Sequence, residues 1–264
     1  MVCLCGAVRV TIRSMMNHFV RFGGFLLATL LVAGCATGGA MKNEASYRFQ
    51  MGVSYLHERN YTAALNELTE AERLNPDDPE LLFNLGLAYY YKNQYAAAER
   101  RFSRAVELKP GFSQARNYLG DTYLRMKRWD DAIAQFTIVS EDLFSADQEN
   151  AGINLGLAYL GKGDVATALA QLRPRVAANP QNPAAHLFLG RAYMADGKVS
   201  QAIGEYREAL RIVPEYAEAD YYLGLACLKG NRPDEARNAF REVVRLSPYS
   251  ELGRLSQEQI DVLK

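Results

Sequence analysis

A glycine recurs about every 34 residues along most of this 264-residue chain, and this spacing constrains the fold more than any other feature. An alanine stands twelve residues after each glycine, and a large apolar residue stands four residues beyond that alanine. A fixed period of this length is typical of a stack of similar supersecondary units. The glycines are Gly52, Gly86, Gly120, Gly156, Gly190 and Gly224, and the alanines are Ala64, Ala98, Ala132, Ala168, Ala202 and Ala236.

The segment 79–112 shows what one unit contains. Leu82, Leu85 and Tyr89 recur at the helix period, and a second apolar face follows around Phe102. Polar residues 92–94 separate the two faces, and Pro110 ends the unit because proline removes a backbone donor. Such a hairpin buries its apolar faces only against neighbouring copies. We expect small residues where its two helices approach closely, since a larger side chain there costs ~1–3 kcal/mol.

This pattern resembles the tetratricopeptide repeat (TPR) in period, residue types and register. The resemblance covers residues 45–250 and implies an all-α fold, a right-handed α-solenoid of six helix-turn-helix repeats. Residues 251–264 read as a capping helix over the last apolar face. The expected repeats are 45–78, 79–112, 113–148, 149–182, 183–216 and 217–250.

Residues 1–34 differ from the repeats. They contain three arginines and no acid, followed by the apolar run FGGFLLATLLVAG. That run is shorter than the ~20 residues of a membrane span and is typical of a secretory signal. Residues 31–35, Leu-Val-Ala-Gly-Cys, resemble the lipobox of bacterial lipoproteins, which implies signal cleavage and lipidation at Cys35. A plain signal peptide or a short anchor helix is the alternative, and Met1, Met15 or Met16 could each be the start.

The lipobox resemblance also implies a cellular location for the protein. Ala36 and Thr37, rather than an aspartate, follow the cysteine, which by resemblance to the enterobacterial sorting pattern implies the outer membrane. We therefore expect a protein lipid-anchored on the periplasmic face of that membrane, with residues 35–44 as the lipidated cysteine and a flexible tether. Beyond residue 34 the chain has 27 basic and 30 acidic residues, so no nucleic-acid partner is implied.

No enzyme constellation is present in the sequence. The three histidines, His18, His57 and His186, are too far apart in a solenoid to form one site. Residues 156–163 nearly match a phosphate-binding loop, but they lack the final Ser or Thr and follow no strand. We expect no catalytic residue, no metal, no cofactor and no small-molecule substrate. Cys227 stands at a tyrosine position of the repeat, so we expect a small buried apolar residue.

One junction is irregular. The step from Gly120 to Gly156 is 36 residues, and residues 138–149 occupy the place of the usual closing proline. Pro174 then falls inside the second helix of the fourth repeat, where it predicts a kink or a shorter helix. Two interpretations stay open: a tolerated insertion, or a bend that shapes the binding surface.

The TPR resemblance implies that first-helix residues around each glycine line a concave, protein-binding groove. Here these residues are apolar and aromatic with a polar middle, which suits an extended peptide or a helix. The lysine and asparagine of the family's clamp for chaperone termini are replaced by Phe49 and Val53. The candidate partner-binding residues are Phe49, Phe83, Asn84, Leu87, Tyr90, Asn117, Asp121, Arg125, Asn154, Arg191 and Tyr221.

A lipobox followed by six such repeats resembles the type IV pilus biogenesis lipoproteins, the pilotins of the pilus secretin. This resemblance implies a non-enzymatic scaffold that binds a secretin subunit and assists its assembly or localisation. The alternative is a periplasmic adaptor for cell-wall enzymes or another envelope complex. The resemblance rests on architecture rather than on a diagnostic motif.

Overall fold

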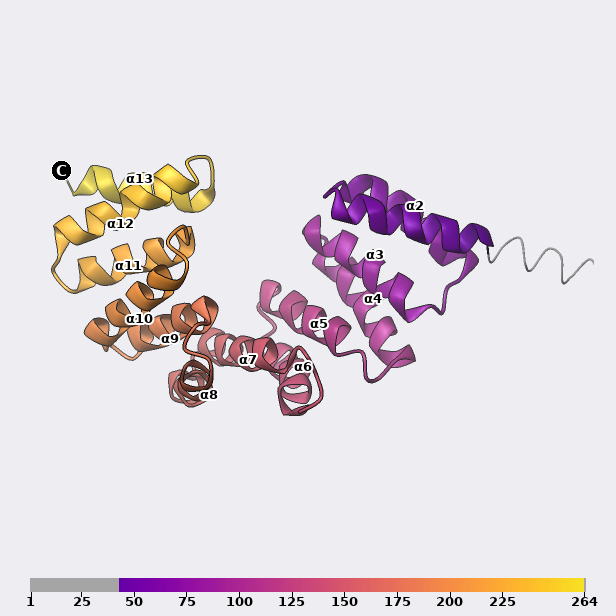
Figure 1. Cartoon of the computed structure of the whole chain (residues 1–264), viewed down its shortest axis with the longest axis horizontal. Helices are drawn as coiled ribbons and strands as arrows, with labels where there is room; N and C mark the ends of the chain where they lie inside the picture. Colours follow the sequence, from indigo (N-terminus) through magenta and orange to yellow (C-terminus); the bar gives the residue numbers. More distant parts are fainter. Residues whose placement is uncertain (1–42, 264) are drawn as a thin grey trace, which may run out of the picture. The chain divides into compact units, whose positions relative to one another are not determined.

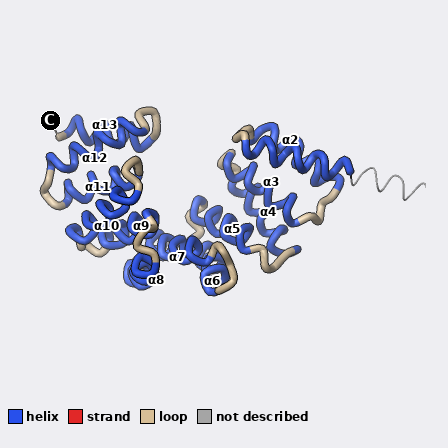
Figure 2. The backbone as a smooth tube through the Cα atoms, viewed as in Figure 1, coloured by secondary structure: helices blue, strands red, loops and turns tan. Residues whose placement is uncertain are grey.

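The structure, a computed structural model, describes residues 43–263, and every regular element in that range is an α-helix (Figures 1 and 2). The predicted fold class, an all-α stack of helix-turn-helix repeats, is confirmed. Cys35, the signal segment and the tether as far as residue 42 lie outside the described residues. In the described part of the chain, no helix has the length and apolar character needed to cross a membrane.

Helices of 13–15 residues alternate with short turns along the repeats. The first helices of the repeats span residues 43–57, α3 (Pro79–Tyr91), α5 (Ser113–Arg125), α7 (Gln148–Lys162), α9 (Pro183–Ala195) and α11 (Ala217–Lys229). The second helices are α2 (Tyr61–Leu74), α4 (Tyr95–Leu108), α6 (Trp129–Glu141), α8 (Val165–Ala178), α10 (Val199–Ile212) and α12 (Pro233–Leu246), and α13 (Glu251–Val262) follows.

The chain divides into two compact units, one ending at Lys92 and one beginning at Asn93. In the first unit, Leu68, Leu81 and Leu85 form a core between α2 and α3. The first helix begins before residue 45, so residues 43 and 44 are helical and the expected tether is two residues too long. The reason is that Ala45 is buried and Glu44 lies 3.6 Å from Arg48 one turn later, which favours the helix.

In the second unit, each repeat glycine lies against a large side chain of the second helix of the same hairpin. A Cβ built on Gly120 or Gly190 would lie 2.7 Å from the Phe136 ring or 2.5 Å from the Tyr206 ring. The small residue is therefore required by the residue sixteen positions later rather than by the alanine at twelve. That alanine is also buried: Ala132, Ala168, Ala202 and Ala236 each have no exposed surface.

The irregular junction forms a turn between α6 and α7. Leu143 and Phe144 are exposed there, Phe144 almost completely (99%). Pro174 does not shorten its helix, because α8 has 14 residues, as α10 and α12 have; the alternative, a kink, stays a prediction. Pro174 is exposed and so is Ala170, whose carbonyl loses the helical bond, so water can satisfy that carbonyl.

Candidate protein-binding groove

Three successive first helices of the second unit, α5, α7 and α9, line an open cavity of about 420 Å³. Of these helices, α5 contacts α7 and α7 contacts α9 (Figure 1). We call this cavity the α5–α9 groove. Its walls are Gln114, Asn117, Tyr118 and Asp121 from α5, Asp147, Asn150, Ile153 and Asn154 in and just before α7, and Ala184 and Phe188 from α9.

The repeat register explains why these residues share one surface. Most of them stand six, three or two residues before the repeat glycine, or one residue after it. These positions lie on one face of a helix, since side chains three and four apart are neighbours. Because the same face recurs in each hairpin, stacking the repeats lines up equivalent side chains into one surface.

The polar part of the groove contains an unsatisfied acceptor. Asn117 Oδ1 is buried and has no hydrogen-bond partner. Leaving such an atom unpaired costs ~1–3 kcal/mol, so a donor supplied by a bound segment would be favourable. Gln114, Asn150 and Asn154 add further amides, which both donate and accept as a peptide backbone does.

The apolar part of the groove consists of Tyr118, Ile153 and Phe188. The Tyr118 ring stacks on Phe102, with ring centroids 5.8 Å apart, so its position is fixed by the core. The Arg191 guanidinium lies 5.6 Å from the centre of the Phe188 ring and 3.8 Å from Glu218 Oε1. Fixed aromatic rings beside amides suit a segment with alternating apolar side chains and exposed backbone.

The structure brings together three of the predicted site residues, Asn117, Asp121 and Asn154. Three others of the second unit do not line the cavity. Arg125 is exposed, and its Nε lies 3.9 Å from Asp121 Oδ2. The Arg191 guanidinium lies over the Phe188 ring, and the centroid of the Tyr221 ring is 6.0 Å from that of Phe240.

The predicted residues of the first unit are partly buried and partly half-buried. Phe83 and Tyr90 are buried, with 5% and 9% of their surface exposed, so their rings offer little area to a partner in the free chain. The Asn84 side chain donates to the Glu80 carbonyl (2.8 Å), within its own helix. Phe49 and Leu87 are half-buried. A partner-binding role for these five residues stays a prediction.

Several residues of the groove were not predicted from the sequence. Phe188 stands two residues before Gly190, the same position that gave Asn84 and Asn154, so the register could have found it. A further position, six residues before the repeat glycine, also faces the groove. It is occupied by Gln114, Asn150 and Ala184. Asp147 comes from the irregular junction, where no repeat register applies.

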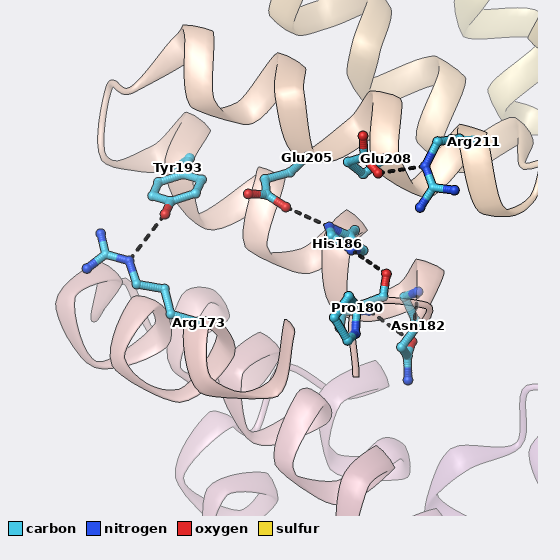
Figure 3. Close-up of polar contacts among 10 residues, drawn as sticks. Arg173, Pro180, Asn182, His186, Tyr193, Glu205, Glu208 and Arg211 are labelled. Atoms are coloured by element: carbon cyan, nitrogen blue, oxygen red, sulfur yellow. Dashed lines mark hydrogen bonds and ion pairs between the residues drawn. The ribbon is translucent and has the colours of Figure 1, made fainter. Parts of the chain in front are cut away.

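Among the described residues, His186 and Cys227 are buried, whereas His57 is not. His57 is exposed, whereas His186 is buried with Nδ1 2.7 Å from Glu205 Oε2 and Nε2 3.1 Å from the Pro180 carbonyl (Figure 3). Cys227 is fully buried as predicted, and burial raises the pKa of its thiol. Within residues 43–263, no three His, Cys, Asp or Glu side chains are grouped so that they could hold a metal ion.

Solved structures with the same fold include two proteins of type IV pilus biogenesis. PilF of Pseudomonas aeruginosa is 18% identical with a TM-score of 0.64, over 83% of this chain and 99% of that chain. PilW, a type IV pilus biogenesis factor, is 21% identical with a TM-score of 0.70, over 81% and 98%. A tetratricopeptide repeat protein of Parabacteroides merdae is 15% identical with a TM-score of 0.71, over 95% and 99%. At these identities the likeness shows the fold alone.

Family profiles identify the repeats directly. The profile described as tetratricopeptide repeat matches residues 84–139, 153–217 and 191–251, and a second TPR profile matches residues 54–91. No curated protein sequence matches the chain. The first profile alone covers more than half of the residues, and proteins of this family bind protein partners. The chain therefore belongs to the tetratricopeptide repeat family.

Proposed function

We propose that this protein is a non-enzymatic scaffold that binds an extended segment of a partner protein in the α5–α9 groove. The observation that carries the proposal is the buried, unpaired Asn117 Oδ1 in a cavity lined by amides and aromatic rings. Three helices packed about 8–10 Å apart give a groove of roughly 20 Å. At about 3.3 Å per residue, that length takes six or seven residues of an extended chain.

The proposed partner is a subunit of a type IV pilus secretin, and the proposed location is the periplasmic face of the outer membrane. Support comes from the lipobox at residues 31–35 and from the shared fold with PilF and PilW. A periplasmic adaptor for cell-wall enzymes is the second candidate, since the same lipid anchor and groove would serve it equally well.

Lipidation of Cys35 is the first expected outcome. Mass spectrometry of the mature amino terminus should show an acylated cysteine, because the basic, apolar and lipobox segments follow in order. Two or more acyl chains give firm anchoring, so the Cys35→Ala variant should leave the membrane fraction. A mature protein that starts at another residue, or a Cys35→Ala variant that fractionates unchanged, would contradict lipidation.

Deleting the gene separates the two candidate partners. The pilus role predicts that secretin multimers disappear from the outer membrane and return with the wild-type gene. They should not return with Asn117→Ala/Asn154→Ala, provided that this variant is present at the wild-type level. Normal secretin multimers in the deletion strain, together with altered cell-wall cleavage, would favour the adaptor.

A further inference from the structure

The residue four before the repeat glycine makes a polar contact in several repeats, whereas in the second repeat it is the buried, apolar Leu82. In the third repeat this residue is Arg116, whose guanidinium donates to Gln135 Oε1 (3.0 Å) and to the Pro110 carbonyl (3.1 Å). The side chain thus joins the second helix of its hairpin to the preceding turn. We call the space that it fills the donor slot.

The fifth repeat fills its donor slot in the same way. His186 contacts Glu205 on α10 and the carbonyl of Pro180 in the preceding turn, as Figure 3 shows. Glu205 and Pro180 are the register equivalents of Gln135 and Pro110. In the first repeat, Arg48 Nη1 likewise donates to Glu67 Oε2 (2.9 Å).

The fourth repeat fills the slot from the opposite helix. Gly152 stands four before the repeat glycine and has no side chain to contribute. A Cβ placed on it would overlap the guanidinium of Arg175, which comes from α8. The donor slots of the third, fourth and fifth repeats are therefore all occupied by nitrogen donors, two of them guanidinium groups.

The sixth repeat reverses this chemistry. Its residue at the slot position is Asp220, an acceptor, and the register equivalent of Gln135 and Glu205 is Ala239. Asp220 is 94% buried, since only 6% of its surface is exposed, and its Oδ2 has no hydrogen-bond partner. A buried carboxylate oxygen without a partner is unfavourable, and this slot lacks the donor that the slots of the first, third, fourth and fifth repeats contain.

The donor slot of the sixth repeat opens into a cavity. Asp220 lines a cavity of about 390 Å³ between α11 and α12, together with Leu223, Asn238, Ala239 and others. We infer that this cavity is a binding site for an arginine side chain of a partner protein, which supplies from outside the guanidinium that the neighbouring repeats supply themselves. Leu223 and Ala239 would contact the aliphatic stem, and Asp220 would accept from the guanidinium. The site shares no residue with the α5–α9 groove.

The charged groups around Asp220 agree with this assignment. Glu235 and Glu242 line the cavity but are already paired, with Arg207 at 2.5 Å and Arg245 at 2.7 Å. Arg241 also lines the cavity. Burial, and secondarily Glu242, raises the pKa of Asp220 to about 7, with Arg245 opposing. A guanidinium favours the ionised carboxylate, so its binding should lower this pKa and strengthen as the pH rises from about 6 to 8.

The test is an NMR titration of the isotope-labelled full chain with acetyl-arginine amide at about pH 8. We expect shifts of the Asp220 carboxyl signal and of the Leu223 and Ala239 amides. Acetyl-citrulline amide has nearly the same shape without the charge and should bind about tenfold more weakly, which corresponds to ~1.4 kcal/mol. Asp220→Asn should remove the response, whereas Asn117→Ala/Asn154→Ala should keep it even if the groove proposal fails.

A second variant guards against misfolding of Asp220→Asn. Ala239→Arg places a guanidinium in the slot from α12, so it should raise the melting temperature at about pH 8 and abolish the response to the probe. Equal responses to the two probes, or an unchanged response in a folded Asp220→Asn variant, would overturn the inference. So would an Asp220 pKa that is ordinary in the free chain and rises in Arg241→Gln, because Arg241 would then fill the slot itself.

Discussion

Replacing Gly190 by alanine should destabilise the protein by ~1–3 kcal/mol, although alanine is the better helix former. The added Cβ would lie 2.5 Å from Tyr206 Cε1 and 2.8 Å from Cδ1. Tyr206 has no exposed surface and stacks on Tyr222 with ring centroids 6.1 Å apart, so its ring has nowhere to move. Thermal unfolding should show a melting temperature lower by about 2–4 °C for each kcal/mol.

Gly204→Ala in α10 of the same repeat is the matched control. Gly204 is exposed, and a Cβ there would meet nothing within 4 Å. The same chemical change should therefore stabilise the protein by up to ~1 kcal/mol, because alanine loses less backbone entropy in a helix than glycine does. Melting shifts of the same sign for the two variants would show that Gly190 is not a point of close helix contact.

The double variant Asn154→Ala/Phe188→Ala should lose at least tenfold, ~1.4 kcal/mol, in affinity for the bound partner segment. Anchoring aromatic residues often contribute ~2 kcal/mol or more each to binding, and Asn154 lines the same groove. Both residues are half-buried on the groove surface rather than in the core, so the melting temperature should change little. Affinity can be measured by isothermal titration calorimetry with the purified partner.

The control for this pair is Asn66→Ala/Phe144→Ala, which makes the same two changes outside the groove. Asn66 is exposed on α2, and Phe144 is exposed in the turn before α7. This variant should bind as the wild type does. If the control loses affinity and the groove variant does not, the partner binds outside the groove, at Asn66 or at Phe144.

The repeats could be predicted because their packing requires particular residue sizes at fixed positions. For example, the Phe136 ring leaves no room for a side chain at position 120, so a glycine recurs sixteen residues before each large apolar residue. The same register placed Asn117, Asp121 and Asn154 on the surface that forms the groove. The repeat period was therefore sufficient to predict the fold and three residues of the candidate site.

Other features do not follow from the period. The turn inside each hairpin uses one residue with positive φ, and four of these six residues are Asn or Gly, which favour it. Arg59 and Lys127 adopt the same conformation, so residue type alone does not find every turn. Phe83 and Tyr90 have the types of binding residues, yet they are buried. Whether an aromatic side chain on a first helix faces the core or the groove depends on its neighbours, which the single sequence does not give. Asp220 becomes notable only when its surroundings are compared with those of Arg116 and His186.

Site-directed photo-crosslinking in living cells tests the binding groove most directly. Benzoylphenylalanine in place of Phe188 or Tyr118 would lie in the α5–α9 groove. In place of Tyr249 or Phe144, whose side chains are fully exposed, it would lie outside the groove. We expect positions 188 and 118 to capture the same partner protein. Mass spectrometry should locate both crosslinks in the same segment of that partner. Capture of that partner from 249 or 144 but from neither groove position would contradict this expectation.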